Sequence, residues 1–169
     1  EASGLPFSSV LASAVALGAP VIRVWAGDRG SLNADDNYRR MIAADALRVT
    51  ALAASKGVSI AYEWHENTLT DALDSSLKLL EDAVHPCLRT YWQKGSGVEH
   101  ADCLVELSKI QDRLDNIHVN YILRNERKPL SYGMGAWREY LEAANVDEKT
   151  RYALLEFVCE DSPKAWHTH

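Results

Sequence analysis

The sequence predicts an α/β protein with a (β/α)₈ TIM barrel architecture, and two observations favour this fold class. Five short strand-like runs alternate with helical stretches, which is typical of βαβ units and a parallel sheet. In each run one parity is bulky and apolar while the other carries polar groups, so one face of the sheet collects ionisable side chains. A barrel gathers such groups at its C-terminal mouth, whereas an open doubly wound sheet has nearly continuous apolar strands. The alternative is an α/β domain with polar residues scattered over edges and surface.

The elements follow one another regularly along the chain. A short amphipathic helix is expected first, ending at Gly18 before Pro20. Gly57 ends the next helix, and Pro86 separates a further helix from its strand. No linker or low-complexity segment interrupts the chain, so we predict one partial barrel domain over residues 1–169. The predicted strands are 21–26, 58–65, 88–93, 116–122 and 152–158, and the helices between them are 35–56, 69–84, 98–114 and 135–144.

Composition excludes several classes of function. The chain has 169 residues and a net charge of −6, which weighs against nucleic acids and anionic membranes, because both require a basic surface. No apolar run approaches the length of a membrane span. The three cysteines are odd in number and form no CxxC motif, which indicates reduced thiols in a cytoplasmic protein.

Four polar residues stand near the C-terminal ends of different predicted strands, on the polar parity. Two carboxylates, an imidazole and an amide oxygen form a ligand set suited to Mn²⁺, Mg²⁺, Co²⁺ or Zn²⁺. A divalent ion would also allow both carboxylates to stay ionised in a partly dry pocket, where they would otherwise repel each other. The four residues are Glu63, Gln93, His118 and Glu156.

The predicted strands lie in five segments that read LGAPVIRVWAG, GVSIAYEWHENTLTDA, HPCLRTYWQ, LDNIHVNY and YALLEFVCEDSP. In order and spacing, over about residues 17–163, they resemble the fourth to eighth strands of the sugar phosphate isomerase/epimerase family, which has the xylose isomerase-like TIM barrel. The resemblance implies a metal held by Glu63, Gln93, His118 and Glu156. Epimerases of this family carry Asp where this chain has Gln93, a change that removes one negative charge.

The resemblance implies metal-dependent isomerisation or epimerisation of a sugar or sugar phosphate through a cis-enediolate. Glu63 and Glu156 would then remove and return the α-proton. The family places a substrate-binding arginine at the position of Arg124. Further substrate-binding candidates are His65, Arg23 and Trp25, although Arg23 and Trp25 could equally fill the barrel interior.

Other interpretations remain open. The same scaffold also carries metal-dependent hydrolases and dehydratases, and a truncated barrel could be catalytically impaired. An eight-stranded barrel needs about 250 residues, so five strands imply a fragment, a barrel completed by another subunit, or an open sheet. Because unpaired parallel strand edges invite association, we expect a homo-oligomer with a small sugar as substrate. A monomer in light scattering at micromolar concentration would contradict the expected oligomer.

Overall fold

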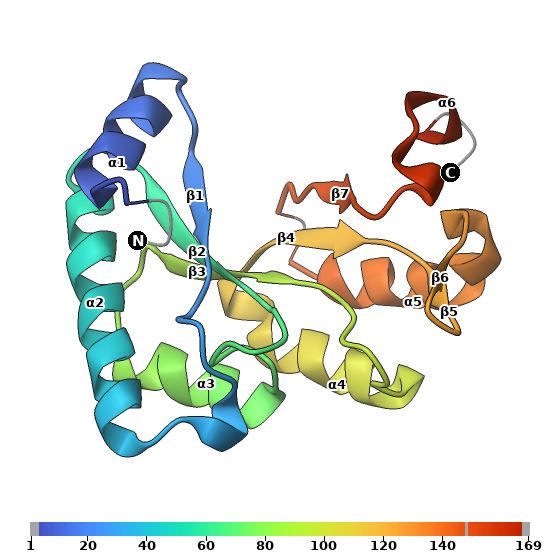
Figure 1. Cartoon of the computed structure of the whole chain (residues 1–169), viewed down its shortest axis with the longest axis horizontal. Coiled ribbons are helices and arrows are strands. Elements are labelled where there is room, and N and C mark those ends of the chain that lie inside the picture. The colour runs from blue at the N-terminus through green and yellow to red at the C-terminus, as the bar shows by residue number, and fades with distance from the viewer. Residues whose placement is uncertain (1–3, 148, 167–169) are drawn as a thin grey trace. The chain divides into compact units, whose positions relative to one another are not determined.

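The computed structural model describes residues 4–147 and 149–166, and it divides into two compact units, residues 1–91 and 92–169. Helices and strands alternate along the chain (Figure 1), and five strands form one sheet in the order β1-β2-β3-β4-β7. The predicted α/β alternation is therefore confirmed. Within the described residues, no helix is both long and apolar enough to cross a membrane.

The first unit contains three helices and the strands that they flank. Helix α1 ends in a Schellman motif at Gly18 (φ 67°), where the amide of Ala19 donates to the carbonyl of Ala14 at 2.9 Å. The Asp35 carboxylate caps helix α2 by accepting from the amide of Tyr38 at 2.8 Å. The elements are α1 (Phe7–Ala16), β1 (Val21–Val24), α2 (Asp36–Ala54), β2 (Ser59–Glu63), α3 (Leu73–Asp82) and β3 (Leu88–Trp92), whose last residue begins the second unit.

The two-faced strand pattern is borne out by the register of the first unit. Ile22, Ile60 and Leu88 are paired across three parallel strands and are buried. Alternation then places the next residues of these strands, Arg23 and Arg89 among them, on the opposite face. The apolar face belongs to a core that helix α2 covers.

The second unit contains two helices that pack against each other and an aromatic cluster around Trp92. The fully buried Trp92 meets the rings of Trp137 and Tyr140 edge-on, with centroids 6.2 and 5.5 Å away. Its indole Nε1 donates to Glu106 at 2.9 Å. The elements are α4 (His100–Ile110), β4 (Leu114–Val119), β5 (Ile122–Leu123), β6 (Glu126–Arg127), α5 (Met134–Ala144), β7 (Ala153–Leu155) and α6 (Pro163–Trp166).

Two strands of the second unit are shorter than the sequence predicts. The strand expected over 116–122 ends at Val119, and the chain continues into the β5–β6 hairpin. Arg124 and Asn125 both have positive φ (52° and 64°), as the two-residue turn of a hairpin requires. The strand expected over 152–158 stops at Leu155, because Phe157 takes a left-handed conformation (φ 52°) that extended structure does not allow.

Candidate metal and substrate site

In the first unit the candidate site is built around Glu63, the last residue of β2. Its side chain is buried and forms an ion pair with the guanidinium of Arg23. The same carboxylate oxygen, Oε2, accepts a hydrogen bond of 2.6 Å from the indole Nε1 of Trp25. Two donors, a guanidinium and an indole N–H, therefore fix the position of this carboxylate at the end of the strand.

Trp25 and His65 lie against each other beside this carboxylate. Their ring centroids are 4.4 Å apart with an interplanar angle of 35°. Trp25 is 55% exposed and the Arg23 side chain is 44% exposed. Both side chains are therefore accessible to solvent in this part of a barrel, and their contact with a substrate stays a prediction. The structure thus brings three predicted substrate-binding residues together around Glu63.

His65 has a defined tautomer when its ring is neutral. Its Nδ1 lies 2.7 Å from the carbonyl oxygen of Glu66, and a carbonyl can only accept. The proton of the neutral ring is therefore on Nδ1, which leaves the lone pair on Nε2. A ring in this state can accept a proton at Nε2.

Two buried threonines fix the end of β2, and their hydrogen-bond network was not predicted from any local pattern. The Thr70 hydroxyl donates to the carbonyl of Glu63 at 2.5 Å. The Thr68 hydroxyl donates to the carbonyl of His65 at 2.7 Å, and the two hydroxyls lie 2.9 Å apart. Threonine is common in strand ends and turns, so only the folded chain identifies this network.

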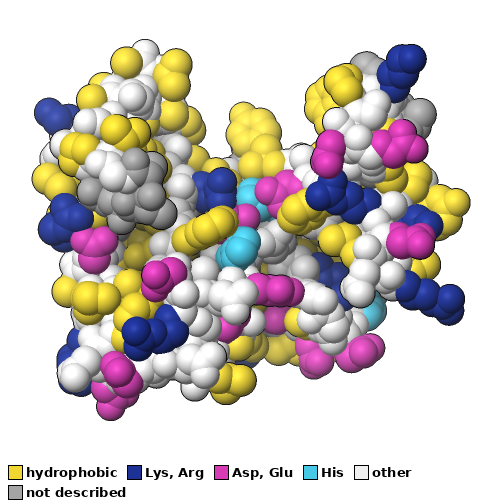
Figure 2. Space-filling model, viewed as in Figure 1, with side chains coloured by type: hydrophobic (Ala, Val, Ile, Leu, Met, Phe, Trp, Pro, Cys, Tyr) yellow, Lys and Arg dark blue, Asp and Glu magenta, His cyan; other side chains and the backbone are white. Residues whose placement is uncertain are grey.

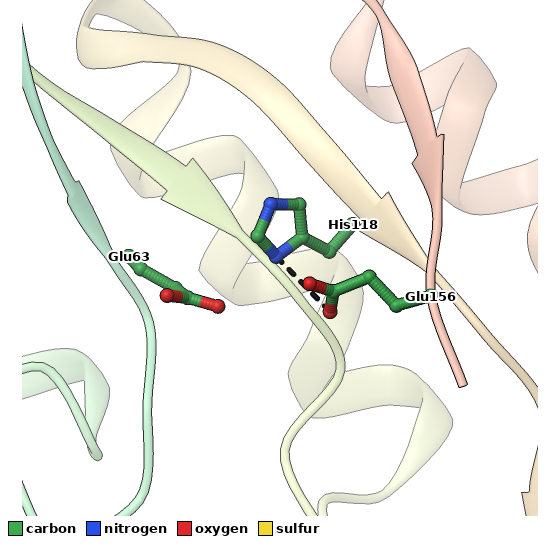
Figure 3. A group of neighbouring side chains, drawn as sticks. All are labelled: Glu63, His118 and Glu156. Carbon is green, nitrogen blue, oxygen red and sulfur yellow. Dashed lines mark ion pairs between the residues drawn. The ribbon is translucent and has the colours of Figure 1, made fainter. Parts of the chain in front are cut away.

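In the second unit the candidate site consists of His118 on β4 and Glu156 just after β7. The strands pair in parallel with His118 opposite Leu154, and the amide of Glu156 donates to the carbonyl of Val119 at 3.0 Å. This register points the two side chains toward each other, with His118 Nδ1 3.2 Å from Glu156 Oε2 (Figure 3). The imidazole is buried, and 29% of the Glu156 side chain is exposed.

The donor chemistry of these residues fits a divalent ion. Glu156 Oε2 is buried and accepts no hydrogen bond from the described residues. Glu63, His118 and Glu156, the three side chains drawn in Figure 3, each offer one ligand atom of a type that divalent metals bind. A buried carboxylate oxygen facing an imidazole nitrogen is costly without a cation or proton to share.

The other predicted residues have simpler positions. Gln93 follows directly on β3 and is half-buried. Arg124 is exposed in the turn of the β5–β6 hairpin. Their proposed contacts with a metal and a substrate stay predictions. On the face shown in Figure 2, acidic and basic side chains are interspersed.

Parallel strands with a carboxylate or an imidazole at their C-terminal ends define the chain as part of a (β/α) barrel with a candidate metal centre. No family model matches the chain. A 3-dehydroshikimate dehydratase from Bacillus anthracis is 32% identical over an 81-residue alignment that covers 44% of this chain and 29% of that protein.

Solved structures establish the kind of barrel. The probable 3-DHS dehydratase of Bacillus anthracis superposes with a TM-score of 0.78 at 22% identity, covering 89% of this chain and 62% of that one. A xylose isomerase-like TIM barrel protein from Mycobacterium smegmatis, in complex with magnesium, gives 0.71 at 15% identity, with coverages of 94% and 61%. Further matches include an L-ribulose 3-epimerase and a D-allulose 3-epimerase from Methylomonas sp..

These matches confirm the fold that the sequence resemblance implies. The chain has the xylose isomerase-like TIM barrel fold, and its described residues form five strands of it. It spans less than two thirds of the length of the two barrels from Bacillus anthracis and Mycobacterium smegmatis. Metal-bound structures occur among the matches, one with magnesium and one with zinc.

Proposed function

We propose that this chain carries the metal centre of an enzyme that removes a proton next to a carbonyl group of a polyhydroxylated compound, and that the reaction is a dehydration. The observation that carries the proposal is the set of carboxylate and imidazole groups at strand C-terminal ends, Glu63 in one unit and the facing pair of His118 and Glu156 in the other. The choice of dehydration is supported by the 32% identity to a 3-dehydroshikimate dehydratase.

Three residues hold the metal in this proposal: Glu63, His118 and Glu156, with the amide oxygen of Gln93 as a fourth donor. Two carboxylates and a neutral imidazole offset the charge of a divalent cation, and Gln93 adds a ligand without further charge. The bound ion would polarise the substrate carbonyl and an adjacent hydroxyl. His118 would bind the ion as a neutral imidazole, through the lone pair of a ring nitrogen.

The remaining residues of the first unit bind the substrate and move the proton. Trp25 offers an exposed ring beside the carboxylate, and Arg23 offers a half-exposed guanidinium for an oxygen of the substrate. His65 accepts the α-proton at Nε2, since its Nδ1 proton is directed to the carbonyl of Glu66. The electron pair of the broken C–H bond forms a C=C bond, the β-hydroxyl leaves, and a proton converts it to water.

A second candidate reaction is epimerisation, in which Glu63 and Glu156 remove and return the α-proton and no hydroxyl leaves. The matches to two ketose 3-epimerases favour it. Gln93 argues against it, because the epimerases that the sequence resembles have Asp at this position. Both reactions begin with removal of an α-proton, but they differ in the residue that accepts it and in the fate of the intermediate.

The experiment begins with metal content. Purified protein is analysed for bound metal, stripped with a chelator and reloaded with Mn²⁺ or Mg²⁺. It is then incubated with 3-dehydroshikimate, whose loss of water gives an aromatic product that is followed by ultraviolet absorbance. D-allulose and L-ribulose in deuterated water test for epimerisation, because proton return introduces solvent deuterium at the α-carbon.

Substitutions test whether the proposed metal ligands matter more than other carboxylates nearby in the chain. We expect Glu63→Gln and Glu156→Gln to lower metal affinity and turnover by about 10- to 100-fold or more. The matched controls are Glu66→Gln and Glu160→Gln, which remove exposed carboxylates from the loops that follow the same two strands. A wild-type protein that binds no divalent metal, or that turns over only in the epimerase assay, would refute the dehydratase proposal.

A further inference from the structure

We infer that Arg127 is a positioning residue that holds Glu156 in place by fastening the β5–β6 hairpin to the segment after β7. The inference rests on the proposed role of Glu156 as a metal ligand. Arg127 belongs to β6, and it makes contacts with Phe157 and Asp161, on either side of the turn that follows Glu156.

Glu156 needs such support because its strand is short. β7 has three residues and, within the described part of the chain, pairs on one side only, with β4. Directly after Glu156 the backbone enters the left-handed region at Phe157 (φ 52°), and it does so again at Glu160 and Asp161 (φ 60° and 47°). Residues other than glycine adopt this conformation only where surrounding contacts hold them.

Arg127 supplies those contacts from the hairpin. Its guanidinium carbon lies 5.3 Å from the centroid of the Phe157 ring, within the range of a cation–π interaction. Its Nη1 donates to Asp161 Oδ1 at 2.5 Å. The thiol of Cys159 donates to the backbone carbonyl of Arg127 at 3.3 Å. Three points of the turn after Glu156 are therefore attached to one residue of β6.

The hairpin is itself attached to the rest of its unit. The amide of Lys128 donates to the carbonyl of Tyr121 at 2.8 Å, which closes the base of the hairpin. The Trp137 indole donates to the carbonyl of Asn120 at 2.9 Å, and the ring of Tyr121 packs so closely on Gly133 that a Cβ there would lie 2.4 Å from it. The hairpin follows β4, the strand that carries His118. Arg127 therefore links the segment after His118 to the segment after Glu156, the two proposed metal ligands of this unit.

The test uses Arg127→Met, which keeps an unbranched apolar stem and removes the charge and the donors of the guanidinium. We expect Mn²⁺ affinity, measured by titration with electron paramagnetic resonance detection, to fall about 10-fold, the lower end of the effect of groups that orient metal ligands. Arg127→Lys keeps the charge but loses the planar guanidinium. Its Mn²⁺ affinity should therefore lie between that of the wild type and that of Arg127→Met. Arg138→Met, an exposed arginine on α5, is the matched control and should bind as the wild type does.

Amide hydrogen exchange of the metal-free protein gives a readout that does not depend on metal. The Glu156 amide, which donates to the carbonyl of Val119, should exchange at least several-fold faster in Arg127→Met, while amides of α4 keep their rates. Wild-type protein that binds no Mn²⁺ would overturn the proposed function, and the exchange rates would still decide the role of Arg127. Unchanged exchange at Glu156 in Arg127→Met would overturn the positioning role. Faster exchange with unchanged Mn²⁺ affinity, in a wild type that binds the ion, would also overturn it.

Discussion

Replacing Trp92 by Phe tests how the second unit is held together. Trp92 is fully buried, and its Nε1 donates to Glu106, which is also buried. Burial raises the pKa of Glu106, while the hydrogen bond from Trp92 lowers it. The substitution keeps an aromatic ring in contact with Trp137 and Tyr140 but removes the donor.

The expected cost has two parts. A hydrogen bond to a charged group contributes about 1.5–3 kcal/mol to the free energy of unfolding. The smaller ring leaves part of the indole volume empty, which costs about 1–2 kcal/mol in lost burial and cavity formation. Together they predict that Trp92→Phe lowers the free energy of unfolding by about 2.5–5 kcal/mol at pH 8, a large share of an ordinary domain's stability.

The cost should depend on pH, and its sign follows from the raised pKa of Glu106. Between the unfolded pKa of about 4.3 and the higher folded pKa, the native state binds more protons than the unfolded state, so stability falls as pH rises. Loss of the Trp92 donor raises the folded pKa of Glu106 further. Trp92→Phe should therefore cost less at pH 5, where Glu106 is protonated more easily, than at pH 8.

Urea unfolding followed by circular dichroism at both pH values measures this cost. Trp166→Phe is the control, since Trp166 is 59% exposed and its replacement should change stability by less than about 0.5 kcal/mol. In a Glu106→Gln background, the effect of Trp92→Phe should no longer change with pH. A cost below about 1 kcal/mol at pH 8, or an equal pH dependence in the Glu106→Gln background, would refute the reasoning.

Three further predictions concern the first unit, β7 and the metal. Gly27→Ala should destabilise the protein by about 1–3 kcal/mol in urea unfolding, because Gly27 has a φ of 83° and an added Cβ would lie 2.1 Å from the Tyr38 hydroxyl; Tyr38→Phe should recover part of this loss. Arg151→Met should destabilise by about 1–3 kcal/mol and speed amide exchange in β7, because the buried Arg151 side chain pairs with Asp147 and donates to two backbone carbonyls. Mn²⁺ at 100 times its dissociation constant should stabilise the wild type by about 2.7 kcal/mol, and the same concentration should stabilise Glu63→Gln markedly less.

Much of the strand arrangement could be predicted from the sequence, because alternation and helix-ending residues are local signals. Gly57 has the left-handed conformation (φ 72°) that the predicted helix end requires. The β5–β6 hairpin could not be predicted, since its turn is Arg124–Asn125 and lacks the Asn-Gly or Asp-Gly pair that normally marks such turns. For this reason the predicted strand 116–122 includes Ile122, which belongs to the hairpin in the structure.

The candidate site was predictable to a similar degree. The alternation of apolar and polar residues predicted that Glu63 and His118 lie near the C-terminal ends of two strands, and the structure has them there. Whether Arg23 and Trp25 face a substrate or fill an interior depends on tertiary exposure, which no local pattern contains. The role of Arg127 was missed for the same reason, because its contacts reach to Phe157 and Asp161, about thirty residues further along the chain.

The hydroxyls of Thr68 and Thr70 hold the end of β2 without help from the exposed part of the loop that follows it. Thr70 secures the Glu63 carbonyl from a position beyond the exposed residues Glu66 and Asn67. Changes at those two exposed positions can therefore reshape what the loop offers to a ligand while the carboxylate stays where it is. Recognition of a ligand by this loop could therefore change without moving the proposed metal ligand Glu63.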